Sequence, residues 1–307
     1  MVLSPKPQRY STLPTISEEH DVLSLASNEA HCSQPSPQAE HDIALANFDI
    51  IPSSGYPTLC RKRSGNTVYT IKASSHMSHT EKSVLDSVRA LCAPFVESVY
   101  WSFGEEGQVY LVSEPRSDAN LATLVKNSGP VASADVLYYA CEVVDALSSL
   151  HAANIIHRDL TPFNVFVDHT GHIVLSNFSN AMMISADAPS QSAAMEYQAP
   201  EHLLGWAHDF AVDCWSFGTL LHFLLAGTNP VVDGEDPDAT RSRILNGNIV
   251  LNDLLLTEAK DLIRKCLERN PALRLTIGRI REHNYFANVY GATFSCATDR
   301  GLTFAFT

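Results

Sequence analysis

The 307-residue sequence is poor in basic residues and has no long apolar run. Lys and Arg number 21 against 34 Asp and Glu, so the net charge is −13 at pH 7 and a nucleic-acid surface is not expected. The basic triplet Arg61–Arg63 is followed by Ser64-Gly65-Asn66, a sequence typical of a hairpin turn. The triplet is therefore interpreted as the solvent-exposed end of a strand. No apolar stretch is long enough to span a bilayer, and the N-terminus has no apolar signal core.

Paired cysteines are also lacking. The seven cysteines are odd in number, widely scattered and form no CxxC pair. Free thiols in a reducing compartment fit this pattern better than a disulfide framework or a zinc site. We therefore expect a soluble protein of the cytoplasm or nucleus that binds neither nucleic acid nor membranes.

Local composition divides the chain into three parts. Residues 1–44 are rich in Ser, Pro, His and Glu without periodicity, which predicts a disordered leader, and residues 287–307 form a C-terminal tail. The domain between them, residues 45–286, changes character along its length. Short β-rich runs dominate residues 45–114, and helical patterns dominate residues 118–286. This order predicts an α+β protein with a small β-rich N-lobe and a larger, mainly α-helical C-lobe.

Hydrophobic periodicity places individual elements within these lobes. Alternating apolar and polar residues predict strands at Thr67–Lys72 and Val109–Val112, and a hairpin joining Phe166–Val167 to Val174–Leu175. Apolar residues at helical spacing predict the following helices: Glu81–Leu91, Ala134–Ala152, Asp213–Leu225, Thr257–Glu268 and Ile277–His283.

The most informative stretch runs from Ile156 to Val165 and reads IHRDLTPFNV. It resembles the catalytic loop of the eukaryotic protein kinases, H-R-D-L-K-P-x-N, with Thr161 in place of the lysine. In that family the aspartate, here Asp159, takes the proton of the substrate hydroxyl, and the asparagine, here Asn164, holds a magnesium ion. Thirteen residues after Asn164, the chain reads Asn-Phe-Ser from Asn177 where the family has Asp-Phe-Gly.

Further motifs follow in the order of the family. Tyr69-Thr70-Ile71-Lys72 resembles the V-A-I-K strand, whose lysine contacts the phosphates of ATP. Glu81 resembles the helix glutamate that pairs with this lysine, although the two lie only nine positions apart. Three later motifs are similar to A-P-E, D-x-W-S-x-G and N/D-P-x-x-R-x-T: Ala199–Glu201, Asp213–Gly218 and Asn270–Thr276. The resemblance implies a bilobal protein-kinase-like fold.

The resemblance also assigns supporting roles. It implies that Asp213 braces the backbone of the catalytic loop and that Glu201 and Arg274 form a buried ion pair, since either charge left alone would be costly. Arg158 stands where the family meets an activation-segment phosphate, for which the candidate acceptors are Ser185, Ser190 and Ser192. The positions that the family stacks into its regulatory spine are Leu85, Val99, His157 and Phe178.

The resemblance implies an ATP site lined by Lys72, Gly55, Glu81, Ser113, Glu114 and Phe166. The glycine-rich loop of the family corresponds to Ile50–Pro57, which keeps only Gly55, and Pro52 has no N–H to offer a phosphate. Thr70 and Phe166 narrow the slot for the base, whereas Ser113 leaves space nearby. ATP binding is therefore expected to be weak.

The remaining substitutions concern phosphoryl transfer. Asn164 and Asn177 would be the metal ligands, and both are neutral, whereas Mg²⁺ favours anionic oxygen, so a role for Mg²⁺ is doubtful. Thr161 replaces the catalytic-loop lysine that stabilises the transferred phosphoryl group in the family. Ala194 stands where Ser/Thr kinases have a threonine whose hydroxyl hydrogen-bonds that lysine and the catalytic aspartate. We expect a pseudokinase with a scaffold or allosteric role and a protein partner.

The alternative is an active Ser/Thr kinase that acts on protein hydroxyls with Asp159 as base, Lys72 on the phosphates and Asn164 on one metal ion. A tyrosine kinase is disfavoured only weakly, and a small-molecule kinase of related fold is disfavoured by the A-P-E motif and Arg274.

Overall fold

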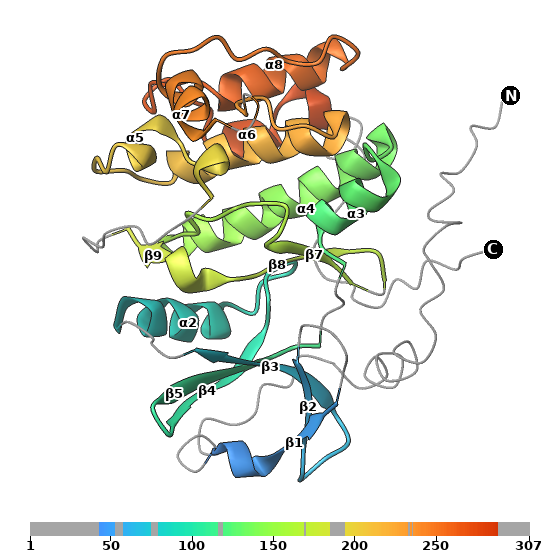
Figure 1. The fold of residues 1–307 in the computed structure, drawn as a ribbon, viewed down its shortest axis with the longest axis vertical. Helices are drawn as coiled ribbons and strands as arrows, with labels where there is room; N and C mark the ends of the chain where they lie inside the picture. The colour runs from blue at the N-terminus through green and yellow to red at the C-terminus, as the bar shows by residue number, and fades with distance from the viewer. Residues whose placement is uncertain are drawn as a thin grey trace, which may run out of the picture.

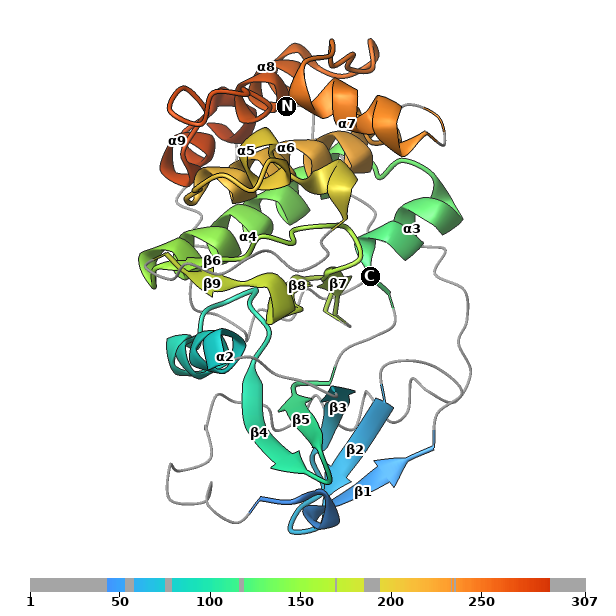
Figure 2. The same cartoon turned by 60° about the vertical axis from the view of Figure 1, so that its left-hand side comes forward.

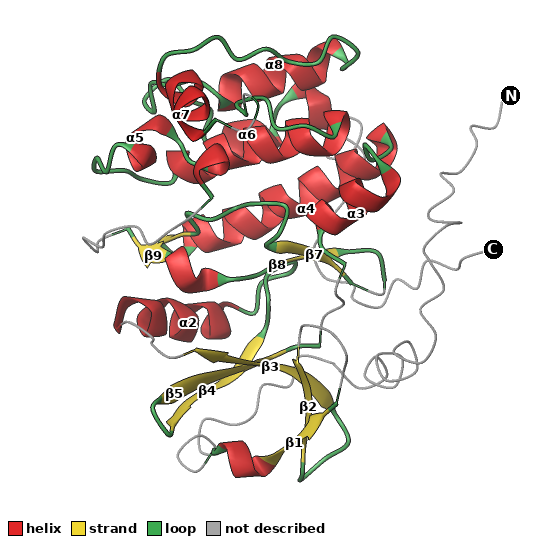
Figure 3. Ribbon diagram, viewed as in Figure 1, coloured by secondary structure: helices red, strands yellow, loops and turns green. Residues whose placement is uncertain are grey.

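The computed structural model describes residues 43–52, 58–74, 79–115, 119–168, 170–184, 194–232, 234 and 236–287. The predicted leader up to residue 42, the tail from residue 288, Gly55 and the serines at 185, 190 and 192 lie outside the described residues. The described chain forms two lobes, one built on a sheet and one built on helices (Figures 1 and 3). The predicted α+β, bilobal architecture is confirmed.

The N-lobe is a five-stranded antiparallel sheet in the order β1-β2-β3-β5-β4. A short 3-10 turn, η2 (Leu45–Asn47), leads into it. One face of the sheet is covered by an apolar cluster that includes Trp101, and the Lys62 ammonium lies 4.5 Å from the centre of that ring. The strands are β1 (Phe48–Ile51), β2 (Thr58–Lys62), β3 (Val68–Ser74), β4 (Val99–Glu105) and β5 (Gln108–Ser113).

Strand register decides which side chains face the C-lobe. Thr70 and Lys72 are two residues apart on β3, so their side chains lie on the same face. Their partners on β5 are Ser113 and Leu111, and directly opposed residues share a face. Lys72, Leu111 and Ser113 line the cavity between the lobes, so this is the inner face of the sheet.

Helix α2 (His79–Leu91) lies between the sheet and the C-lobe (Figure 1). Its buried residues Val84, Leu85 and Val88 recur at helical spacing and join the main hydrophobic cluster of the protein. The stripe predicted over Glu81–Leu91 therefore holds the helix against the C-lobe.

The C-lobe is built around α6 (Ala211–Ala226), which is buried almost all round. Gly218 lets α8 approach it, because a Cβ at this position would lie 2.7 Å from Cβ of Cys266. The other C-lobe helices are α3 (Leu121–Ser128), α4 (Ser133–Ala152), α5 (Pro200–Leu203), α7 (Pro237–Leu245), α8 (Thr257–Cys266) and α9 (Ile277–Arg281). Three 3-10 turns accompany them: η3 (Phe178–Asn180), η4 (Met195–Tyr197) and η5 (Asn284–Phe286).

Two short antiparallel ladders lie between α4 and the N-lobe, as both views show (Figures 1 and 2). Strands β7 (Val165–Val167) and β8 (Ile173–Leu175) form the predicted hairpin, and β6 (Ile155–Ile156) pairs with β9 (Met182–Met183). They hold the catalytic-loop and Asn-Phe-Ser segments at the junction of the lobes.

Two further observations concern the cysteines and the possibility of a membrane-spanning helix. Five cysteines lie in the described ranges, and all five are free thiols. Within those ranges, no helix combines the length and the apolar character needed to cross a bilayer.

Candidate functional site

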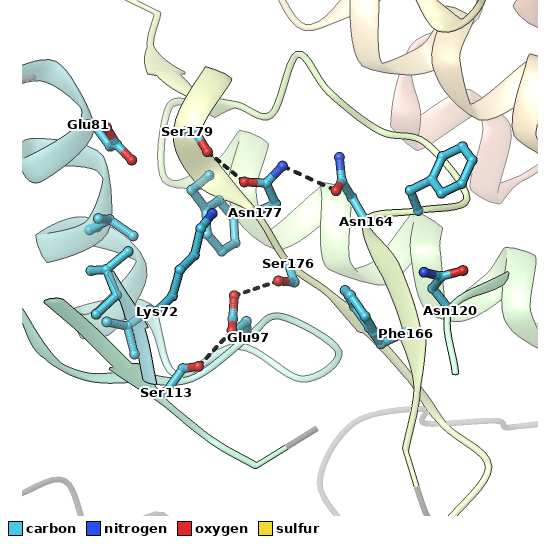
Figure 4. A pocket seen from close by; sticks show the side chains of 15 residues that line it. Lys72, Glu81, Glu97, Ser113, Asn120, Asn164, Phe166, Ser176, Asn177 and Ser179 are labelled. Carbon is cyan, nitrogen blue, oxygen red and sulfur yellow. Dashed lines mark hydrogen bonds between the residues drawn. The ribbon is translucent and has the colours of Figure 1, made fainter. Parts of the chain in front are cut away.

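A cavity of about 260 Å³ lies between the inner face of the sheet and the β7–β8 hairpin (Figure 4). Six of the nine predicted site residues line it: Lys72, Glu81, Ser113, Asn164, Phe166 and Asn177. Asp159 lies beside it, hydrogen-bonded to the amide of Asn177. The structure thus brings together residues from both lobes that are up to about a hundred positions apart in the sequence.

Glu114, predicted to line the nucleotide site, faces another direction. Its carboxylate accepts a hydrogen bond from the backbone N–H of Ser98 at 3.0 Å, and its own N–H donates to the carbonyl of Ser98. Glu114 therefore fixes the end of β5 to the start of β4, and its side chain is not part of the cavity wall.

The ion pair expected between Lys72 and Glu81 is not formed. No ion pair joins these two residues in the described part of the chain, and Figure 4 shows Glu81 on α2, away from the Lys72 ammonium. Glu81 occupies the first turn of α2 and lies only nine positions after Lys72. Because the helix is entered so early, its first turn does not bring the carboxylate to the lysine.

The catalytic-loop backbone is braced as predicted. The buried Asp213 carboxylate accepts hydrogen bonds from the N–H groups of His157 (2.9 Å) and Arg158 (2.8 Å). Arg158 has a positive φ of 61°, an uncommon conformation for a residue other than glycine. Burial alone would raise the pKa of Asp213, but the hydrogen bond from His151 and the neighbouring charges lower it. The ionised Asp213 therefore supports a strained loop.

Asp159 is held within the loop by amide groups. Nδ2 of Asn180 donates to its carboxylate at 3.1 Å, and Nδ2 of Asn164 donates to its backbone carbonyl at 2.8 Å. Burial raises the pKa of Asp159, although nearby His157 and these amides oppose the shift. A proton would thus be bound more readily by this carboxylate than by an exposed aspartate.

Asn177 adopts the left-handed conformation (φ 68°, ψ 78°), which asparagine tolerates better than most residues. Its Nδ2 donates to Oδ1 of Asn164 at 3.1 Å and lies 3.5 Å from Oδ2 of Asp159. The hydroxyl of Ser179 donates to its Oδ1 at 2.6 Å, which fixes the orientation of the amide (Figure 4). An N–H donor, not an oxygen, therefore faces the other polar groups of the site.

Arg158, predicted to meet an activation-segment phosphate, donates its Nε–H to the backbone carbonyl of Asn180 at 2.6 Å. The serines proposed as phosphate acceptors lie outside the described residues, so this pairing stays a prediction.

The predicted spine positions are all buried. The rings of His157 and Phe178 meet edge to face with centroids 5.4 Å apart, and Leu85, Val99 and Phe178 belong to one hydrophobic cluster. Since Leu85 comes from α2 and Val99 from β4, this cluster runs through both lobes.

The predicted ion pair in the C-lobe is also present. Arg274 donates two N–H groups to the Glu201 carboxylate, at 2.6 and 3.0 Å, and both side chains are at most 4% exposed. This bidentate pair fixes α5, at the end of the activation segment, to the segment before α9.

A second carboxylate of the cavity wall, besides that of Glu81, was missed in the sequence. Glu97 is only 8% exposed, and its two oxygens accept hydrogen bonds from the hydroxyls of Ser113 (2.8 Å) and Ser176 (2.7 Å). Figure 4 shows this carboxylate between the two serines on the cavity wall. The available signal was a charged residue inside the apolar run Phe95–Val99.

Comparison with known proteins decides the family. A family model described as protein kinase domain matches residues 53–286. The chain belongs to the protein kinase family. The fold and motif order of a kinase domain, expected from the sequence, are thereby confirmed.

Individual relatives of this kinase domain are kinases by name. The chain is 30% identical over 264 residues to ribosomal protein S6 kinase alpha-6 of Mus musculus and 31% identical over 254 residues to ribosomal protein S6 kinase alpha-3 of Homo sapiens. It is 32% identical over 227 residues to the cAMP-dependent protein kinase catalytic subunit of Dictyostelium discoideum. These matches cover 80%, 77% and 72% of the chain but only 34% of each relative, so the chain spans about a third of their length. It is a Ser/Thr-kinase-like protein.

The orientation of the Asn177 amide bears on the magnesium ions that kinase domains use. Asn177 turns its Nδ2 toward Asn164 and Asp159, and an N–H group repels a cation. In the described residues no group of three or more His, Cys, Asp or Glu side chains could hold a metal ion. The polar groups of Asn177 are hydrogen-bonded to side chains of the protein.

Proposed function

We propose that this kinase-domain protein is a pseudokinase, which binds an adenine nucleotide weakly without the help of Mg²⁺ and acts on protein partners as a scaffold or allosteric regulator. The observation that carries the proposal is the amide of Asn177, whose Nδ2 donates to Asn164 where a catalytic kinase would need a metal-binding oxygen. The Asn177 side chain is thus already satisfied by protein groups.

Other features of the site support weak nucleotide binding. The cavity of about 260 Å³ lies below the roughly 300–1,000 Å³ of most small-molecule sites, which suits a base better than a whole ATP. Thr161 is 2% exposed and uncharged, so it offers no cation to a phosphate. Lys72 lines the cavity and remains available for that role.

The test is the affinity for ATP with Mg²⁺ against the affinity in excess chelator, measured by calorimetry. We expect a difference of less than about threefold. A matched control is Asn177→Asp, which restores a carboxylate at the same position and should make binding strengthen with Mg²⁺. Tenfold or greater strengthening of the unmodified protein, about 1.4 kcal/mol, would contradict the proposal.

The second candidate, an active Ser/Thr kinase, is favoured by the ordered catalytic loop. The Asp159 carboxylate is held by Asn180, and the ring of His157 within the loop packs against that of Phe178. Radiolabel transfer from ATP to a generic Ser/Thr substrate distinguishes the candidates. Strong transfer that disappears in Asp159→Ala would favour this one and overturn the pseudokinase proposal.

A further inference from the structure

Two neighbouring histidines of the C-lobe have ring nitrogens that no group of the protein binds. His202 lies on α5 and is only 5% exposed, and His208 lies in the loop that joins α5 to α6. Nε2 of each ring is buried without a hydrogen-bond partner, and no other histidine of the described ranges has such a nitrogen. A buried polar atom without a partner is costly, so a ligand shared by this imidazole pair would remove a cost from both rings.

Other buried histidines show how the protein satisfies such nitrogens elsewhere. In His222, Nδ1 donates to the carbonyl of Thr228 at 2.7 Å, and Nε2 accepts from the N–H of Asn252 at 3.2 Å. In His151, Nε2 is hydrogen-bonded to the Asp213 carboxylate at 2.8 Å. The imidazole pair therefore departs from the pattern of this C-lobe.

The protonation of the pair suits a metal ion. Nδ1 of His208 lies 2.8 Å from the backbone carbonyl oxygen of Trp206, which can only accept, so Nδ1 carries the proton and Nε2 of the neutral ring offers a lone pair. Burial, followed by the positive charges of His208 and Arg158, lowers the pKa of His202 to about 4, so that this ring is neutral at pH 7. A neutral imidazole whose other nitrogen donates to a carbonyl is the form in which histidine binds metal ions.

The separation of the two rings also fits a shared ion. Their centroids lie 4.9 Å apart, and their planes are inclined by 41°. Two imidazole nitrogens that bind one tetrahedral ion at about 2.0–2.1 Å place their ring centroids about 5 Å apart. The two histidines therefore need little movement to bind the same ion.

We propose that His202 and His208 bind a divalent transition-metal ion, Zn²⁺ in the first place, through their Nε2 atoms. Imidazole is a preferred ligand of such ions, whereas Mg²⁺ prefers oxygen. No third His, Cys, Asp or Glu side chain joins the pair within the described ranges, so water completes the coordination and the affinity is micromolar. Water has access through the loop, because residues 205–207 are exposed.

The bound ion ties the loop before α6 to α5. Glu201, the neighbour of His202 on α5, is held by Arg274, so the ion adds a second connection at the end of the activation segment. Zn²⁺ should therefore raise the temperature at which the protein unfolds, because it binds the folded pair. The site lies outside the cavity between the lobes and does not depend on the nucleotide binding proposed above.

Equilibrium dialysis of the full chain against Zn²⁺ at pH 7 tests the proposal, with the visible absorption of tetrahedral Co²⁺ as a second readout. We expect His208→Gln to bind one Zn²⁺ fewer per chain than the unmodified protein at micromolar Zn²⁺, and to lose the matching part of the Co²⁺ spectrum. The affinity of this site should fall by about a hundredfold or more, since even the groups that support a metal ligand are worth 10- to 100-fold. His202→Gln should lose the same ion.

His283→Gln is the matched control for binding to histidines in general. Nε2 of His283 lies 2.9 Å from the Asp261 carboxylate, so it already has a partner. The number of Zn²⁺ ions bound and the rise in unfolding temperature should be unchanged in this variant. Zinc bound by any other His or Cys of the chain is common to all variants and cancels in the comparison.

The outcomes decide between a shared site and general binding. Equal Zn²⁺ binding and equal Co²⁺ spectra in the unmodified protein and in His208→Gln would overturn the proposal. Loss of the ion in folded His202→Gln but not in His208→Gln, or the reverse, would overturn the shared site. If His202→Gln does not fold, His208→Gln keeps the test valid, because His208 is only partly buried.

Discussion

Arg274→Ala is predicted to lower the free energy of unfolding by about 3–5 kcal/mol, since it breaks a buried ion pair. The guanidinium is fully buried and gives two hydrogen bonds to Glu201. It also donates to three backbone carbonyls and lies 5.2 Å from the centre of the Trp215 ring. Those carbonyls belong to Glu268 (2.7 Å), Ala211 (2.9 Å) and Arg269 (3.3 Å).

The magnitude follows from what the substitution leaves behind. Glu201, whose side chain is 4% exposed, would keep its charge without a partner, which alone accounts for most of the roughly 3–5 kcal/mol. The three carbonyls would each lose a donor, at about 1 kcal/mol per hydrogen bond, unless water enters the space. Adding Glu201→Gln to Arg274→Ala should recover about 1–3 kcal/mol, because it removes the stranded charge.

Urea denaturation at pH 7 measures these changes. The matched control is Arg279→Ala, because Arg279 forms an ion pair with Glu282 in which both side chains are mostly exposed (74% and 68%). Its loss should change the stability by less than about 0.5 kcal/mol. A loss below about 1 kcal/mol in Arg274→Ala, or no recovery in the double variant, would refute the reasoning.

Two further predictions concern proton binding and catalysis. Burial, followed by nearby positive groups, lowers the pKa of His202 from 6.5 to about 4. The neutral imidazole therefore contributes fully to stability above pH 6.5, and this contribution is lost as the pH falls toward 4. In urea denaturation across this window, His202→Gln should remove up to about 3 kcal/mol of the pH dependence of the unfolding free energy, and an unchanged pH dependence would contradict the prediction. Measurable radiolabel transfer from ATP should return in a triple variant that combines Asn177→Asp, Thr161→Lys and Ala194→Thr. Adding Asp159→Ala to this variant should abolish the transfer. If the triple variant binds ATP but transfers no radiolabel, the defect lies in the segment between β1 and β2.

Local sequence patterns predicted the elements because burial sets their periodicity. The helix expected over Ala134–Ala152 is α4 with one more residue, and the helix expected from Ile277 ends early, at Arg281 instead of His283. Such ends depend on capping and packing outside the periodic stretch. The motif order predicted the bilobal arrangement, because each motif belongs to a known place in that fold.

The site was predicted less completely than the fold. The brace by Asp213 was expected from its motif, and the structure has it. The pairing of Lys72 with Glu81 is not seen among the described residues, because the motif gives the residue types but not the path of the chain between them. Glu97 was missed because its partners, Ser113 and Ser176, are distant in sequence. Such contacts follow only from tertiary structure.

The retained and the altered positions differ in what they contribute to the folded protein. Arg274 and Asp213 satisfy buried polar groups, so their loss would cost several kcal/mol with or without a ligand. A lysine at position 161 or an aspartate at position 177 would act mainly on phosphate or metal, and their absence leaves the fold unharmed. Asn177 even gains hydrogen bonds with Asn164 and Ser179. The frame that joins the lobes through Phe178 therefore persists without a lysine at position 161 or a carboxylate at position 177, as the pseudokinase function proposed above requires.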